Sequence, residues 1–195
     1  MNIGIMGGTF DPLHLGHLLV AEQAREQMSL NEVWFMPSNQ SPHKDIQPKA
    51  DPLHRLEMVR LAIADHPKFK LCELEFERGG TSYSVETAYI LKERYPQHQF
   101  HWIIGADMVQ YLPQWFKIQE MISLVSFIGL DRPGYEDVRR DLPDWLSKSL
   151  AMIKMVQFDI SSTEIRNRIA NGQSVRYMLT EPIRSYIQEN QLYGT

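Results

Sequence analysis

The chain has 195 residues, of which 43% are hydrophobic and 23% charged, a composition typical of a globular protein that forms one domain over residues 1–195. Its net charge of −4 argues against a broad nucleic-acid-binding surface, and its single cysteine, Cys72, excludes an intrachain disulfide and a cysteine-rich metal site. No apolar run approaches the roughly 18 residues of a membrane span, and no signal pattern precedes the first apolar run. We therefore expect a soluble cytoplasmic protein without nucleic-acid or membrane partners.

Short apolar runs alternate along the chain with helix-like patterns. The expected strands are 2–6, 32–36, 69–75, 100–104, 124–130 and 154–158. The expected helices are 15–28, 52–65, 85–94, 118–123, 162–170 and 182–190. This alternation predicts an α/β fold with a doubly wound, mostly parallel sheet, whose ligands bind beyond the carboxyl ends of the strands.

The most informative stretch follows the first expected strand and has the sequence GGTFDPLHLGH over residues 7–17. Its glycines allow backbone N–H groups to approach phosphate oxygens, and the next helix adds its N-terminal dipole. His14 and His17 are three residues apart, so they face the same side of that helix. The stretch lacks G-x-G-x-x-G, the P-loop pattern and a third metal ligand, so a phosphate site is favoured over a dinucleotide, P-loop or zinc site. We expect Asp11 to form an Asx turn before Pro12.

Three further stretches follow expected strands, at 37–44, 105–107 and 161–162, and a parallel sheet would bring all of them to one edge. Ser161 and Ser162 open an expected helix, where one of them would act as its N-cap. Arg166 lies one turn further and could clamp a pyrophosphate, although helix arginines are more often solvated.

Two of these stretches carry a family resemblance. GGTFDPLHLGH resembles the motif G-G-T-F-D-P-x-H-x-G-H of the nucleotidylyltransferase superfamily, whose members transfer AMP or CMP from a nucleoside triphosphate. The stretch ISSTEIR at residues 160–166 resembles the superfamily's late S-S-T-x-[IL]-R motif. The intervening blocks are similar to those of the bacterial nicotinate-nucleotide adenylyltransferases, namely WFMP at 34–37, PHK at 42–44, SYS at 82–84, IGAD at 104–107, WF at 115–116 and RPG at 132–134. The resemblance covers nearly the whole chain.

This resemblance implies a Rossmann-like nucleotidylyltransferase fold and an enzyme of NAD biosynthesis. Such an enzyme transfers AMP from ATP to nicotinate mononucleotide, and it releases nicotinate adenine dinucleotide and pyrophosphate. The attack is in line and has no covalent intermediate, and Mg²⁺ is held through the substrate phosphates rather than by protein ligands. The implied catalytic residues are His14, His17 and Arg166. The implied ATP-binding residues are these three together with Gly8, Thr9, Phe10, Gly105, Asp107, Ser161 and Ser162.

The resemblance also implies a pocket for the nicotinate nucleotide. Trp115 and Phe116 could stack on the pyridine ring, although aromatic residues of such a fold more often lie in the core. The Ser84 hydroxyl and backbone N–H groups near Tyr83 could bind the pyridine carboxylate, and Lys44 could neutralise charge between the substrates. The family usually has Thr at the position of Ser84 and often Tyr at that of Phe116.

Three other interpretations stay open from the sequence. A pantetheine-phosphate adenylyltransferase is one, although that family typically has Thr where His14 stands. Preference for the amide, nicotinamide mononucleotide, is the second. A non-catalytic nucleotide-binding module on the same fold is the third, and it would be expected to lose His17 or Arg166. A homo-oligomer is compatible with the sequence, which marks no interface.

Overall fold

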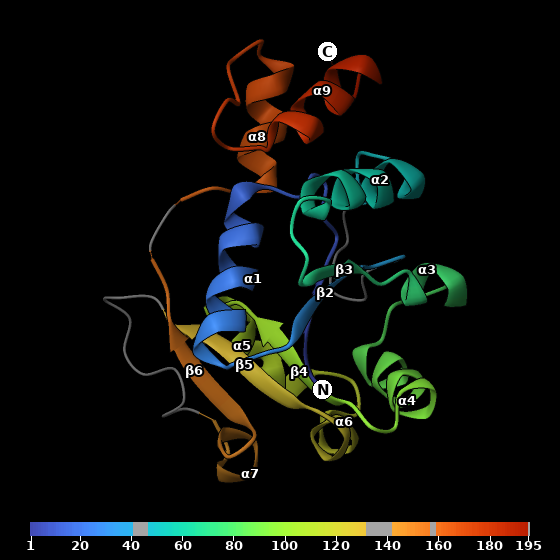
Figure 1. Ribbon diagram of the computed structural model, residues 1–195, viewed down its shortest axis with the longest axis vertical. Helices are drawn as coiled ribbons and strands as arrows, with labels where there is room; N and C mark the ends of the chain where they lie inside the picture. The colour runs from blue at the N-terminus through green and yellow to red at the C-terminus, as the bar shows by residue number, and fades with distance from the viewer. Residues whose placement is uncertain (41–46, 132–141, 157–158, 195) are drawn as a thin grey trace.

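A six-stranded sheet forms the centre of the computed structural model, which describes residues 1–40, 47–131, 142–156 and 159–194, without the side chains of Ala106, Asp107 and Asp131 (Figure 1). The strand order is β3-β2-β1-β4-β5-β6, and every neighbouring pair is parallel. The strands are β1 (Asn2–Gly8), β2 (Glu32–Pro37), β3 (Phe69–Leu71), β4 (Gln99–Ile104), β5 (Ser126–Asp131) and β6 (Leu150–Lys154). The predicted doubly wound parallel sheet is thereby confirmed.

Helices cover both faces of this sheet. They are α1 (Leu15–Gln27), α2 (Pro52–Ile63), α3 (Leu74–Arg78), α4 (Ser84–Arg94), α5 (Ala106–Tyr111), the 3₁₀ helix η1 (Leu112–Gln114), α6 (Ile118–Leu124), α7 (Asp144–Ser147), α8 (Ser162–Ala170) and α9 (Glu181–Glu189). Within the described part of the chain, none of them is both long and apolar enough to cross a membrane.

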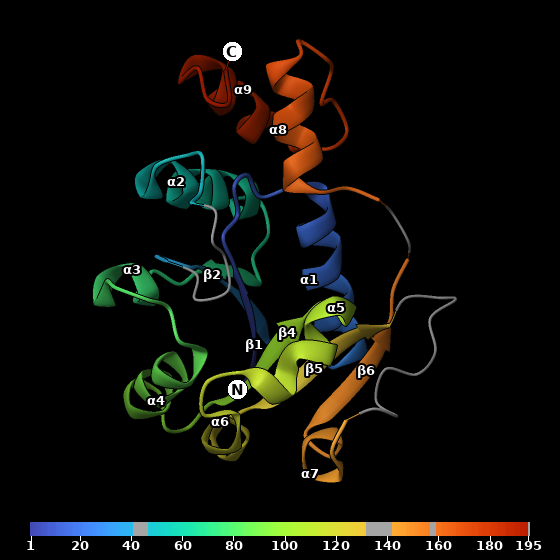
Figure 2. The same ribbon diagram turned by 180° about the vertical axis from the view of Figure 1, so that it is seen from behind.

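Two hydrophobic clusters divide the core between the faces. The first packs residues of α1, α2, α8 and α9 against the sheet, and the second packs residues of α3 to α7. Val33 and Phe35 of β2 belong to the first cluster and Met36 to the second, because alternate residues of a strand face opposite sides. Figures 1 and 2 show α1 on one face of the sheet and α5 and α6 on the other, with α8 beside the start of α1.

The structure differs from the expected elements at two strands. The expected strand 69–75 ends at Leu71, because residues Leu74–Arg78 form α3 and leave the sheet. The last described strand is Leu150–Lys154, whose pairing with β5 aligns Phe127 with Leu150, so it overlaps the expected strand 154–158 only at Lys154, and residues 157 and 158 lie outside the description. A short apolar run is compatible with a helix or a strand, and a strand can pair with its neighbour in more than one register. The run alone therefore does not fix where a strand lies. The short helices α5 and α7 were also not expected.

Candidate nucleotide-binding site

The site lies where the strand order reverses. From β1 the chain moves to β2 and β3 on one side and then returns to β4 on the other. The crevice beyond the carboxyl ends of β1 and β4 is therefore the topological switch point, at which open α/β sheets bind ligands. Gly8 ends β1 and Gly105 follows β4, so two of the predicted stretches flank this crevice.

The loop after β1 has a buried aromatic residue, Phe10, two positions after Gly8. This residue has a left-handed φ of 49° and is only 3% exposed. Its ring packs edge-on against His17, with a centroid distance of 5.1 Å. A Cβ atom at Gly8 would lie 3.0 Å from the Phe10 ring, so a side chain at this position would require the buried ring to shift.

His14 and His17 come together at the start of α1, as their spacing predicts. Their rings stack with centroids 3.7 Å apart and planes at 26°. The His14 backbone N–H donates to Nδ1 of His17 over 3.2 Å, which places the proton of a neutral His17 on Nε2. His14 is 6% exposed, and its buried Nδ1 has no hydrogen-bond partner among the described residues. Burial lowers the pKa of His14 from 6.5 to about 4, so this imidazole is neutral near pH 7.

The shifted pKa of His14 predicts a pH dependence of stability. The imidazole of the unfolded chain gains a proton below pH 6.5, whereas the folded imidazole gains one only near pH 4. The unfolded state therefore binds more protons in this window, and stability falls as the pH falls. This loss of folding stability is absent above pH 6.5 and reaches about 3 kcal/mol near pH 4. Urea unfolding at several pH values measures this effect. The free energy of unfolding should fall less steeply with falling pH for His14→Gln than for wild type, and an equal pH dependence of the two proteins would contradict this account.

The Asp11 carboxylate joins the loop after β1 to the segment before α2. Oδ2 accepts from the Lys49 N–H over 2.8 Å and Oδ1 from the Ala50 N–H over 3.1 Å. Asp11 is 5% exposed. The expected Asx turn is therefore wrong, because the carboxylate bonds backbone that lies 38 and 39 residues away rather than its own turn.

The start of α8 is joined to the same loop. Ser161 is the N-cap of α8, because its Oγ accepts from the Glu164 N–H over 3.1 Å. This confirms that one of the two serines caps the helix. Ser162 Oγ donates to the Pro12 carbonyl over 2.9 Å. Arg166 donates to the Asp11 carbonyl over 2.7 Å. Two stretches that lie about 150 residues apart thus form one surface, and Arg166 is not the solvated helix arginine of the alternative interpretation.

Arg55 is a residue of this region that the sequence analysis missed. Although it lies on α2, it is 1% exposed. Its Nη1 donates to the carbonyls of Thr9 and Ser38, each over 2.8 Å, and its Nη2 to that of Asn39 over 3.3 Å. Burial lowers the pKa of Arg55, an effect that Asp11 opposes, and the guanidinium remains charged. Arg55 therefore ties together the loops that follow β1 and β2.

The loop after β2 is hydrogen-bonded to the segment that precedes α4. The Asn39 N–H donates to Oγ of Ser82 over 3.1 Å, and the Ser82 N–H donates to the Gln40 carbonyl over 2.8 Å. Glu75 of α3 is 5% exposed and accepts from Thr87 Oγ1 of α4 over 3.0 Å. Burial raises the pKa of Glu75. A continuous set of hydrogen bonds thus connects the loop after β1 with the start of α4.

The predicted acceptor residues separate into two groups. Tyr83 is the N-cap residue of α4 and Ser84 is the first residue of that helix. The rings of Tyr83 and Phe116 lie together, with centroids 4.8 Å apart, and Phe116 is 49% exposed. Trp115 instead packs edge-on against Phe127 of the second cluster, with a centroid distance of 6.1 Å. Lys44 lies outside the described residues.

The residues after β4 are described through their backbone. Gly105 is the N-cap residue of α5, and its carbonyl accepts from the N–H groups of Met108 and Val109 over 3.0 and 3.1 Å. Asp107 lies in the first turn of that helix, and its side chain is outside the description. The backbone thus directs the start of α5 toward the carboxyl edge of the sheet.

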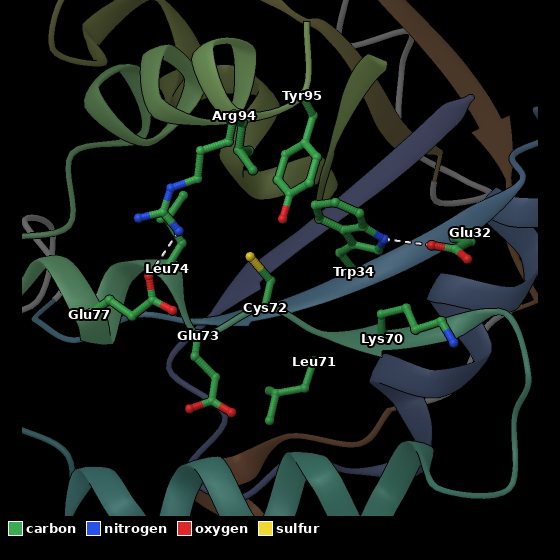
Figure 3. Close-up of a pocket in the computed structure, with 11 residues that line it drawn as sticks. Glu32, Trp34, Lys70, Leu71, Cys72, Glu73, Leu74, Glu77, Arg94 and Tyr95 are labelled. Carbon is green, nitrogen blue, oxygen red and sulfur yellow. Dashed lines mark hydrogen bonds and ion pairs between the residues drawn. The ribbon is translucent and has the colours of Figure 1, made fainter. Parts of the chain in front are cut away.

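A groove of about 440 Å³ lies away from these residues, beside β2 and β3 (Figure 3). None of the predicted site residues within the described part of the chain lines it. Its aromatic wall is formed by Trp34 and Tyr95, whose ring centroids are 5.2 Å apart, and the Trp34 Nε1–H donates to Glu32 at the start of β2. Burial raises the pKa of the Cys72 thiol in this groove, so the thiol stays protonated near pH 7.

Comparisons with known proteins show the family of the chain. The family model described as cytidylyltransferase-like matches residues 5–168. A probable nicotinate-nucleotide adenylyltransferase of Oceanobacillus iheyensis is 45% identical over 98% of this chain and 96% of its own length. The nicotinate-nucleotide adenylyltransferase of Bacillus subtilis is 44% identical over 98% of this chain and 97% of its own.

A solved structure shares the fold. The nicotinic acid mononucleotide adenylyltransferase of Plasmodium falciparum, complexed with NaAD, superposes with a TM-score of 0.78 at 20% identity, over 98% of this chain and 97% of its own. At that identity the likeness concerns the fold, whereas the two bacterial relatives and the family model carry the assignment. The chain therefore belongs to the cytidylyltransferase-like family and, within it, to the nicotinate-nucleotide adenylyltransferases.

Proposed function

We propose that this chain, as a single domain over residues 1–195, transfers AMP from ATP to nicotinate mononucleotide. The products are nicotinate adenine dinucleotide and pyrophosphate. The observation that carries this proposal is the joining of the His14–His17 loop to α8 through Ser162 and Arg166, in a chain that is 45% identical to a probable nicotinate-nucleotide adenylyltransferase. Imidazoles, helix N-termini and a guanidinium on one surface form a site for a polyphosphate.

The reaction needs no protein nucleophile. A phosphate oxygen of nicotinate mononucleotide attacks the α-phosphorus of ATP, and the bond to the pyrophosphate oxygen breaks in line. The enzyme then acts through alignment and through stabilisation of developing negative charge. His17 would donate from Nε2, His14 would act as a neutral donor, and Arg166 would hold the pyrophosphate end. Gly8, Thr9, Phe10, Gly105, Asp107, Ser161 and Ser162 complete the proposed ATP site.

A divalent cation generally accompanies ATP in nucleotidyltransferases of this kind, and we propose Mg²⁺ for this chain. The donors of the site suit phosphate oxygens rather than a metal, and the Asp11 carboxylate already accepts from Lys49 and Ala50. The cation would therefore be held mainly through the substrate phosphates, where it neutralises part of their charge.

The acceptor pocket is proposed at the start of α4. Backbone N–H groups near Tyr83, together with the Ser84 hydroxyl, would bind the pyridine carboxylate at that helix N-terminus. The exposed Phe116 beside Tyr83 offers a ring for stacking, whereas Trp115 packs on Phe127 in the second cluster. Lys44 would reach the phosphate of the nucleotide.

Phe116→Ala should raise the KM for nicotinate mononucleotide about tenfold and leave the KM for ATP within about twofold. The side chain is 49% exposed, so its loss should cost little folding stability. Steady-state kinetics with each substrate varied in turn would measure both constants. Trp145→Ala, which removes a 37% exposed aromatic residue from α7, is the control and should change neither. An equal rise in the KM values of both substrates would show that the acceptor pocket lies elsewhere.

The experiment that tests the proposed function measures pyrophosphate release with ATP and Mg²⁺. Nicotinate mononucleotide, nicotinamide mononucleotide and phosphopantetheine are supplied in parallel as acceptors. We expect a strong preference for the first. Comparable use of the amide would contradict the carboxylate-binding role of Ser84 and Tyr83. ATP binding without turnover on any acceptor would overturn the proposal in favour of a non-catalytic nucleotide-binding module.

A further inference from the structure

We propose that Tyr193, which follows α9, is a positioning residue for the transfer of AMP. It would act through Asp11 to set the position of Arg166. The inference rests on the proposed function, since Arg166 is assigned there to the pyrophosphate end of ATP.

Tyr193 donates to the buried carboxylate that organises the site. Its hydroxyl lies 2.8 Å from Oδ1 of Asp11, a residue that precedes it by 182 positions. The same carboxylate accepts from the N–H groups of Lys49 and Ala50. Three donors from two distant segments thus share one carboxylate, which is 5% exposed. Three such bonds fix both the orientation of Asp11 and the path of the loop that carries His14.

The Asp11 carboxylate also faces a cation that the mechanism needs. Nη1 of Arg166 lies 3.7 Å from Oδ2, beyond hydrogen-bond length, and donates instead to the Asp11 carbonyl. Nη2 donates to Thr163 Oγ1 over 3.1 Å. By donating to Oδ1, the Tyr193 hydroxyl draws electron density from the carboxylate and weakens its pull on Arg166. The guanidinium thereby stays available to a phosphate rather than closing a bidentate pair with Asp11.

Tyr193 is held firmly enough to act in this way. Its ring packs against the first hydrophobic cluster, and its hydroxyl lies 3.9 Å from the Met58 sulfur. The residue has a left-handed φ of 67°, a conformation that a bulky side chain adopts only where its surroundings impose it. Burial and the charge of Asp11 raise the pKa of Tyr193, so the hydroxyl keeps its proton and remains a donor.

Tyr193→Phe tests the role because it removes one hydroxyl and keeps the ring. We expect the KM for ATP to rise and kcat to fall, giving a loss of about tenfold or more in kcat/KM for ATP. The KM for nicotinate mononucleotide should stay within about twofold. Tyr186→Phe is the matched control, since its hydroxyl bonds His54 over 2.8 Å on the neighbouring helix and does not contact Asp11. Both variants are compared by thermal unfolding as well, so that a loss of fold is recognised.

A double-mutant cycle with Arg166→Ala separates positioning from a general structural role. If Tyr193 acts through Asp11 on Arg166, Tyr193→Phe should change kcat/KM for ATP less than twofold in the Arg166→Ala background. Independent losses that multiply in the double variant would overturn the inference. So would a Tyr193→Phe enzyme with the kinetic constants of wild type.

Turnover of the wild-type protein, measured in the same assay, distinguishes a failure of the proposed function from a failure of the role of Tyr193. Absence of wild-type turnover would count against the proposed function alone. The inference is then decided by calorimetric titration with ATP and Mg²⁺, in which Tyr193→Phe should bind ATP about tenfold more weakly than Tyr186→Phe. Equal ATP affinities of the two variants would overturn the role of Tyr193.

Discussion

His17→Ala is expected to lower kcat for AMP transfer by about 10²–10³-fold, the usual cost of removing one preorganised donor from a site where negative charge develops. His17 lies in the first turn of α1, and its Nδ1 accepts from the His14 N–H, so Nε2 is the nitrogen that would donate to the substrate in the proposed mechanism. Alanine is a good helix former, and α1 should persist. Pyrophosphate release measures the loss of turnover, and urea unfolding measures the change in stability.

The control for this prediction is His54→Ala. His54 lies on α2, and its ring bonds Tyr186 rather than the loop after β1. Its replacement should leave kcat within about twofold of wild type, even if some stability is lost. A His17→Ala enzyme that retains wild-type turnover would remove His17 from the proposed mechanism. A loss of turnover that only follows a loss of fold would do the same.

Arg55→Leu is expected to destabilise the protein by about 3–5 kcal/mol, the cost of breaking a buried charged network. The guanidinium is 1% exposed and donates to three backbone carbonyls, those of Thr9, Ser38 and Asn39. Leucine would leave these acceptors without their donor. Because domains are stable by only about 5–15 kcal/mol, a large share of the folding free energy should be lost. Urea unfolding measures it directly.

Arg60→Leu on the same helix is the matched control. Its side chain is 57% exposed and pairs with Glu57 and Glu73 over 3.4 and 3.1 Å. Exposed pairs contribute about 0–1 kcal/mol, so this variant should unfold almost as wild type does. Arg55→Lys should fall between the two, because an ammonium keeps the charge but lacks the planar fork that reaches separate carbonyls. If both leucine variants were equally stable, Arg55 would not hold the two loops together.

The sequence alone determined the class of fold and the place of the loop for which we propose phosphate binding. Apolar runs that alternate with helical patterns predicted the parallel sheet, because strands buried on both faces are apolar along their length. The spacing of His14 and His17 predicted two rings on one side of α1, and the structure stacks them at 3.7 Å. An N-cap among Ser161 and Ser162 was also predicted, because a capping residue and its N–H partner lie within one turn, and the structure shows that it is Ser161. All of these features depend on neighbours in the sequence.

Only the tertiary structure decided which residues hold that loop in place. Nothing in the sequence distinguishes Arg55 from other helix arginines, and Asp11 was predicted to form an Asx turn. Their partners lie 46 positions away at Thr9 and 182 positions away at Tyr193. Likewise, adjacent aromatic residues face different surroundings, since Phe116 meets Tyr83 whereas Trp115 packs on Phe127. Local patterns carry no record of such pairs, because a contact between distant residues exists only after the sheet has brought the ends of its strands together.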